Sequence, residues 1–129
     1  MPDRRILIVD DAEEPRAVLA IALRTISGAE IQVAESAEKA LALLGSDSLD
    51  VLVTDMHLGG MTGLELMDAL RERGQWPASG VVVISGESDP DLPQRVLESG
   101  AAAFFSKPFS ASEVRKSVIS LLELGHGKA

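Results

Sequence analysis

The chain has 129 residues, a formal net charge of −8 and no cysteine. Its length suits a single domain with a core of its own, and its acidity argues against direct binding to nucleic acid or to an anionic membrane, which needs a basic surface. Without cysteine there is no disulfide and no thiolate chemistry. The first apolar run, Ile6–Val9, is too short for a signal peptide or a membrane span. We therefore expect a cytoplasmic protein.

Five short segments have the composition of β-strands. Four of them are apolar on both faces, as the strands of a parallel sheet covered on both sides are. The segment around Ile31 and Val33 differs, because its apolar residues alternate with Gln32 and Ala34, a pattern typical of a strand at a sheet edge. In chain order the predicted strands are Ile6–Val9, Ile31–Val33, Val51–Val53, Val81–Ile84 and Ala101–Phe105.

A segment with helical period follows each strand. Gly45 and Gly74 lie just beyond the second and third of these segments, where a glycine commonly ends a helix. Two prolines near the start of the fourth predict a short helix, and Ser110 followed by Glu113 predicts a capping box at the start of the last. In chain order the predicted helices cover residues 13–27, 37–44, 64–70, 89–99 and a final segment from 110 onward.

The order of elements is therefore five β-then-α units. Strict alternation predicts a parallel sheet with right-handed crossovers and helices on both faces. We expect an α/β fold with a doubly wound, five-stranded, flavodoxin-like sheet of order 2-1-3-4-5, in which the second strand lies at an edge. The domain is predicted to cover residues 4–124, and residues 125–129 form a short tail.

Polar residues stand at the ends of four predicted strands. The carboxyl ends of parallel strands lie along one edge of the sheet, and ligands bind in the crevice where the strand order reverses. Three carboxylates gathered there would repel one another, and Mg²⁺, which prefers oxygen ligands, removes that repulsion. A lysine can hold a phosphoryl oxygen and a serine hydroxyl can hydrogen-bond to it. The set suits phosphoryl transfer to a carboxylate, and its members are Asp10, Asp11, Asp55, Ser85 and Lys107.

Four segments, residues 6–11, 55–63, 81–86 and 100–109, carry a resemblance to a known family when they are taken together and in order. Over residues 4–124 the chain resembles the receiver domains of two-component response regulators, the CheY-like superfamily. No single segment is highly specific, and Asp10 and Asp11 alone would be more readily explained as helix caps. The joint placement of the four segments favours the receiver interpretation.

The resemblance implies a role for each polar residue. Asp55 would accept a phosphoryl group from a sensor histidine kinase or a phosphotransfer protein, and the chain would later dephosphorylate itself. Mg²⁺ would be bound by Asp11 with Asp10 assisting, by Asp55 and by the backbone carbonyl of His57. Lys107 would pair with the phosphoryl group. On this view the chain is a signalling switch and not an enzyme with a separate substrate.

The resemblance also implies how the switch is transmitted. Ser85 would move toward the phosphoryl group while Phe104 turns inward, which alters the face formed by the fourth helix, fifth strand and fifth helix. That face would contact an output domain or a downstream protein. Pro108 has a structural role, and the peptide bond before it is typically cis in the family. A stand-alone regulator and a domain cut from a longer protein both remain open, as does a homodimer.

The chain departs from the family at two positions near the acceptor. The family commonly has proline four residues after the acceptor, where this chain has Gly59, so the stiffness of that loop is in question. Glu87 stands two residues after Ser85, where a side chain can influence access to the site. Neither departure removes a residue that the phosphoryl chemistry needs.

Three other functions are weaker alternatives. A pseudo-receiver, which binds partners without phosphorylation, usually lacks one of the acidic or lysine positions, and all are present here. A phosphatase of the haloacid-dehalogenase type needs two acids separated by one residue, whereas Asp10 and Asp11 are adjacent and Ala12 follows. A flavin-binding relative would place three acids against an anionic phosphate.

Overall fold

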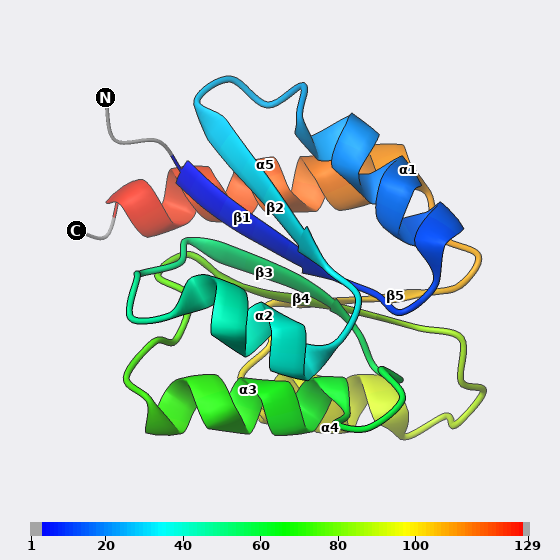
Figure 1. Cartoon of the computed structure of the whole chain (residues 1–129). Coiled ribbons are helices and arrows are strands. Elements are labelled where there is room, and N and C mark those ends of the chain that lie inside the picture. Colours follow the sequence, from blue (N-terminus) through cyan, green and yellow to red (C-terminus); the bar gives the residue numbers. More distant parts are fainter. Residues whose placement is uncertain (1–3, 128–129) are drawn as a thin grey trace.

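The molecule is built on one parallel sheet of five strands in the order β2-β1-β3-β4-β5, as the sequence predicted (Figure 1). The computed structural model describes residues 4–127. The strands are β1 Arg4–Val9, β2 Ala29–Ala34, β3 Val51–Asp55, β4 Gly80–Ser85 and β5 Ala103–Ser106. The helices are α1 Glu13–Leu23, α2 Ala37–Leu44, α3 Gly63–Glu72, α4 Leu92–Glu98 and α5 Ala111–Gly127.

Helices cover both faces of the sheet, so the sheet has a core on each side (Figure 1). Successive residues of a strand point to opposite faces, and β1 shows this directly. Leu7 and Val9 pack with α2, α3 and α4, while Ile6 and Ile8 pack with α1 and α5. Both halves of the core are mainly aliphatic, as the low aromatic content of the chain requires.

Several predicted boundaries are shifted; the fourth helix, for instance, covers Leu92–Glu98 instead of residues 89–99. Two of the shifts are explained by contacts. The first helix ends at Leu23 instead of residue 27. After Arg24 the backbone hydrogen bonds join residues three apart, as in the bond from the N–H of Ile26 to the carbonyl of Leu23, and this tighter turn places Ile26 in the core. The last strand begins at Ala103 instead of Ala101, because the chain joins β4 only at Ala102, whose N–H donates to the carbonyl of Val81. Both errors lie at element ends, where tertiary contacts override local pattern.

The last helix begins after the predicted cap residue Ser110, but only one of the two hydrogen bonds of the predicted capping box is found among the described residues, and the helix runs further than expected. Ser110 Oγ accepts a hydrogen bond from the N–H of Glu113 at 3.2 Å, and the Glu113 carboxylate pairs with Lys116. The helix continues to Gly127, so part of the predicted tail is helical. Residues 128 and 129 lie outside the described residues.

The cap at the start of α3 was not predicted from the sequence. Thr62 and Glu65 form a complete capping box at the start of α3: the Thr62 hydroxyl accepts from the N–H of Glu65, and the Glu65 carboxylate accepts from the N–H of Thr62. This cap fixes the first turn of α3, which follows the loop after Asp55. The threonine-to-glutamate spacing is the recognised signal and would have located it.

No helix in the part of the chain from residue 4 to 127 combines the length and the apolar character that a membrane crossing requires.

Candidate functional site

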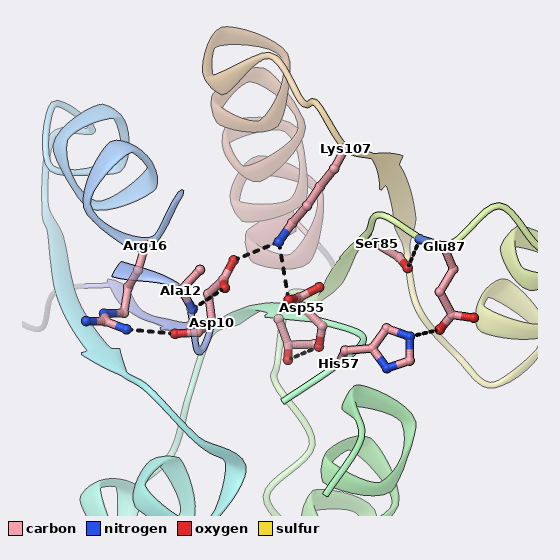
Figure 2. A network of polar contacts seen from close by, with 9 residues as sticks. Asp10, Ala12, Arg16, Asp55, His57, Ser85, Glu87 and Lys107 are labelled. Atoms are coloured by element: carbon pink, nitrogen blue, oxygen red, sulfur yellow. Dashed lines mark hydrogen bonds and ion pairs between the residues drawn. The ribbon is translucent and has the colours of Figure 1, made fainter. Parts of the chain in front are cut away.

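The predicted site residues lie together at the carboxyl edge of the sheet (Figure 2). Asp10 directly follows β1, Asp55 is the last residue of β3, Ser85 is the last residue of β4, and Lys107 directly follows β5. Parallel pairing of β3 with β4 and of β4 with β5 aligns these strand ends. The topology therefore brings together residues that are up to 97 positions apart in the chain.

Three carboxylates form a compact cluster at this edge. Asp10, Asp11 and Asp55 each offer an oxygen, and these oxygens all lie within 4.8 Å of one another. Asp10 and Asp55 are 2% and 7% exposed, whereas Asp11 is exposed to solvent. Two buried acids and one open acid make a site that a small cation can enter from one side.

Lys107 supplies the positive charge within this cluster. Its Nζ lies 3.2 Å from Oδ2 of Asp55 and 3.4 Å from Oδ2 of Asp10. Burial by itself lowers the pKa of Lys107, but the attraction of Asp55 and Asp10 outweighs it and raises the pKa above its usual value. Lys107 is therefore a permanent cation at neutral pH, held between two acids (Figure 2).

Asp55 is an unusually basic aspartate. Burial and the neighbouring charge of Asp10 raise its pKa, and the nearby Lys107 only partly counters them. The fold thus disfavours the carboxylate that it places in the site. A raised carboxylate pKa of this origin means that added positive charge will be bound favourably.

The main chain and an arginine hold Asp10 in place. Its Oδ1 accepts a hydrogen bond from the N–H of Ala12 at 2.9 Å. Its backbone carbonyl accepts one from Nη1 of Arg16 at 2.8 Å. Both contacts fix the turn between β1 and α1 (Figure 2). The contact from Arg16 was not predicted, because it depends on how α1 packs beside β2.

Ser85 is fully buried beside the acids. Its hydroxyl oxygen accepts a hydrogen bond from the N–H of Glu87 at 3.0 Å, and its carbonyl accepts one from the N–H of Lys107 at 2.9 Å. The Ser85 main chain thus links β4 to the segment that carries Lys107. Its role as a moving hydroxyl stays a prediction.

The His57 side chain pairs with Glu87 rather than with the acidic cluster (Figure 2). This contact joins the loop after β3 to the loop after β4, and both side chains reach solvent. The imidazole therefore lies outside the acidic cluster, and the metal-binding role of the His57 backbone carbonyl stays a prediction. The pair itself was not predicted, because the two residues lie on separate loops.

The loop after Asp55 has a backbone that excludes the family's usual proline. Gly59 has φ +85°, a conformation that proline, whose ring fixes φ near −65°, cannot adopt. The N–H of Gly60 donates to the carbonyl of Leu58, which closes a tight turn around Gly59. Glycine at this position is thus required by the turn that this chain forms.

Gly63, the first residue of α3, touches the backbone of Asp55. A Cβ added at Gly63 would lie 2.6 Å from the carbonyl oxygen of Asp55 and 3.2 Å from Cα of Met56. We expect Gly63→Ala to force these backbones apart and to lower the free energy of unfolding by about 1–3 kcal/mol. Chemical denaturation would measure this loss of free energy. At Gly60, the matched control, an added Cβ meets only the mobile end of Glu38 at 3.3 Å, so an equal loss in Gly60→Ala would contradict the close-contact explanation.

Phe104 and Pro108 occupy the last strand and the turn after it. Phe104 is partly buried and packs against the half of the core beneath α2, α3 and α4. The Lys107–Pro108 peptide bond is cis, as the resemblance implied. The switching role of Phe104 and the structural role of Pro108 stay predictions.

The donor set of the cluster fits one class of metal ion. Three carboxylates without a histidine nitrogen or a cysteine sulfur are typical of a hard cation such as Mg²⁺. The raised pKa of Asp55 shows that the site disfavours the bare carboxylate, which a nearby cation would stabilise. The acidic triad is consistent with a metal site.

Comparison with known proteins decides the family. The sequence profile of the response regulator receiver domain matches residues 6–119. The chain belongs to this family. It is 37% identical over 117 residues to the two-component response regulator ORR6 of Oryza sativa subsp. japonica, covering 88% of this chain and 68% of the relative. It is also 29% identical to the chemotaxis protein CheY of Pseudomonas aeruginosa, with 95% and 99% covered.

Solved structures agree with the sequence comparisons. The chemotaxis response regulator CheY4 of Vibrio cholerae superposes with a TM-score of 0.80 at 26% identity, covering 92% of this chain and 98% of the other. A receiver domain protein from Clostridium thermocellum has a TM-score of 0.84 at 21% identity, covering 98% and 99%, which shows the fold. This receiver domain is a phosphorylation-dependent switch rather than a true enzyme, and its Asp10, Asp11 and Asp55 pocket is typical of an aspartyl-phosphate acceptor site.

Proposed function

We propose that Asp55 is the phosphoryl acceptor of this receiver domain and that Mg²⁺ is the metal it requires. The observation that carries the proposal is the position of Asp55, which is buried in the acidic triad with the Lys107 ammonium 3.2 Å from its Oδ2. Asp10, Asp11, Asp55 and the backbone carbonyl of His57 would hold the ion. When bound, it would neutralise the charge that gathers on the transferring phosphoryl group.

The residues of the site perform the transfer by position and charge. An Asp55 carboxylate oxygen attacks the phosphorus atom of a phosphohistidine, the P–N bond to the imidazole breaks, and the imidazole leaves. Lys107 donates to a phosphoryl oxygen in place of its present contacts with Asp10 and Asp55. Hydrolysis of the acyl phosphate by water later restores Asp55, which is the self-dephosphorylation expected of the domain.

The switch itself would use the neighbouring buried hydroxyl. Ser85 Oγ now accepts from the N–H of Glu87, and a phosphoryl oxygen would offer its O–H an acceptor on the other side. Movement of Ser85 would draw the loop after β4 toward the site, and Phe104 would follow inward. The face formed by α4, β5 and α5 would then change shape for a downstream protein or an output domain.

The partner that supplies the phosphoryl group belongs to a two-component system, and a histidine kinase is the partner that the family implies. One relative, the sensor histidine kinase TmoS of Ectopseudomonas mendocina, is 32% identical over 120 residues that make up 12% of its length. We infer that a sensor histidine kinase or a phosphotransfer protein phosphorylates this chain in the cytoplasm.

Transfer from a phosphorylated histidine tests this function. A purified phosphotransfer protein, radiolabelled on histidine, is mixed with the chain in Mg²⁺ or in chelator. We expect the label to move to the wild-type chain and to the exposed-site control Asp68→Asn in Mg²⁺, and to stay on the donor in chelator. Failure of transfer from a panel of such donors would contradict the proposal.

A further inference from the structure

Arg16 of α1 contacts the acidic cluster through its main chain. Its Nη1 donates to the backbone carbonyl of Asp10 at 2.8 Å, and the side chain makes no other hydrogen bond within residues 4–127 (Figure 2). Glu13 and Glu35 line the surface hollows beside Arg16, yet neither forms an ion pair with it in the described part of the chain. The arginine is thus bound to the turn that carries the acids and not to an acidic side chain.

The carbonyl that Arg16 holds belongs to the peptide between the two adjacent acids. Rotation of this peptide would move Asp11 relative to Asp10, because the peptide links their Cα atoms. The pairing of β1 with its two neighbours, β2 and β3, ends at Val9, so no paired strand residue fixes the Asp10 carbonyl. The contact from Arg16 takes the place of such a partner.

The two acids differ in how they are held. The side chain of Asp10 has a donor at each oxygen: the N–H of Ala12 at Oδ1 and Nζ of Lys107, 3.4 Å away, at Oδ2. The Asp11 side chain is exposed and has no such donor among the described residues. Its carboxylate therefore lies where the backbone of the turn places it, and Arg16 holds that backbone.

We propose that Arg16 is a positioning residue for the metal: by holding the peptide between Asp10 and Asp11, it sets their two carboxylates in the relative orientation that Mg²⁺ requires. The inference rests on the proposed function, in which these acids hold Mg²⁺. Mg²⁺ demands nearly ideal octahedral geometry, whereas Ca²⁺ accepts more ligands in a flexible arrangement. A fixed turn therefore favours Mg²⁺ over Ca²⁺, and loss of the Arg16 contact weakens Mg²⁺ binding more than Ca²⁺ binding.

The charge of Arg16 acts in the opposite direction. A guanidinium beside a cation site repels the cation, so removal of this charge would by itself strengthen Mg²⁺ binding. Glu35 offsets only part of the charge, since its lowered pKa is due mainly to Lys39 and to a smaller extent to Arg16. A weaker affinity for Mg²⁺ after the loss of Arg16 would therefore be due to position and not to charge.

A contact that only fixes the start of α1 is the alternative. Ala12, the N-cap of α1, makes no side-chain hydrogen bond, so the contact of Arg16 with the preceding turn would stabilise the first turn of the helix. Loss of such a contact would lower the stability in chelator but leave the preference between the two ions unchanged. The ion preference therefore separates the two roles.

Titration of the full chain with magnesium chloride and with calcium chloride tests the proposal. Amide shifts of the isotopically labelled protein give a dissociation constant for each ion. Arg16→Met keeps much of the apolar stem but removes the donor, and it is expected to weaken Mg²⁺ binding about tenfold and Ca²⁺ binding by less than about threefold. Arg16→Lys keeps a donor on a shorter side chain and is expected to recover part of the loss.

A matched control uses another arginine of the same helix end-to-end. Arg24, the C-cap of α1, lines one of the hollows that Arg16 lines but contacts none of the three acids in the described residues. Arg24→Met removes the same charge and is expected to leave both dissociation constants unchanged.

The rate of phosphorylation by a small phosphodonor gives a second readout. Arg16→Met should need about tenfold more Mg²⁺ for half of the maximal rate, while the rate at saturating Mg²⁺ stays within about twofold of the wild type. The maximal rate is kept because Asp55 and Lys107 are unchanged.

Three results would overturn the proposal. These are an unchanged or tighter Mg²⁺ dissociation constant in Arg16→Met, an equal weakening of both ions, and a lower rate at saturating Mg²⁺ with unchanged half-saturation. A wild-type chain that binds neither ion would contradict the proposed metal site, and this inference with it. Thermal unfolding in chelator shows whether each protein is folded. Should Arg16→Met not fold, Arg16→Lys decides alone, with a weaker affinity and a reduced preference for Mg²⁺ expected.

Discussion

Asp55→Asn is expected to abolish phosphoryl uptake and, at neutral pH without metal, to make the protein more stable. Uptake is lost because the amide is not a nucleophile. Stability rises because burial and the charge of Asp10 disfavour the Asp55 carboxylate, as its raised pKa indicates, and the neutral amide avoids both costs. We expect an increase of roughly 2–5 °C in Tm, measured by thermal unfolding in chelator.

The pH dependence of the Tm difference between Asp55→Asn and the wild type tests the electrostatic cause. The pKa of Asp55 is raised in the folded state, so the proton on wild-type Asp55 stabilises the fold at low pH. This stabilisation is lost as the pH rises through the folded-state pKa, whereas asparagine does not titrate. The advantage of Asp55→Asn should therefore be small in acid and grow above the usual range of an aspartate. An equal Tm difference at all pH values would contradict the electrostatic cause.

Lys107→Met is expected to have the opposite effect on stability. Methionine keeps most of the length of the side chain but leaves the buried Asp10 and Asp55 carboxylates without the cation that both now contact. We expect a loss of about 1–3 kcal/mol at pH 8 in chelator. Phosphorylation in Mg²⁺ should slow by about 10- to 100-fold, because one fixed charge for the phosphoryl group is missing.

Two controls separate this effect from a general loss of charge. Lys116→Met removes an exposed lysine of α5 and should change the stability by less than about 0.5 kcal/mol. In the double variant Asp55→Asn with Lys107→Met, the loss should be smaller than in Lys107→Met alone, since one of the two unpaired acids is gone. Denaturant titrations of the wild type, Asp55→Asn, Lys107→Met and the double variant give the coupling free energy between the two side chains. An additive result would contradict the contact between Lys107 and Asp55.

The sequence was most informative where local pattern and topology act together. Apolar runs and helical periods predicted every strand and helix and the order of the sheet. Because parallel strands end at one edge, the same order predicted that Asp10, Asp55, Ser85 and Lys107 would meet, and they do.

The features that were missed depend on contacts between distant segments. The first helix stops early because Ile26 enters the core, and nothing in its own period shows this. The His57–Glu87 pair joins two loops whose relative position the sequence does not encode locally. Gly59 was recognised as a departure from the family, but its positive φ follows from the turn that it forms. The Thr62–Glu65 cap, by contrast, is a local signal that could have been predicted.

The central claim is that Asp55 takes up one phosphoryl group in a reaction that requires Mg²⁺. Its most direct test is the intact mass of the wild-type chain after incubation with a small phosphodonor, with Mg²⁺ or with chelator, followed by borohydride reduction and peptide mapping. We expect one added phosphoryl group in Mg²⁺ only, with the reduced residue at position 55. No adduct, or a phosphoryl group on another residue, would contradict the account and indicate a receiver fold that binds its partners without phosphorylation.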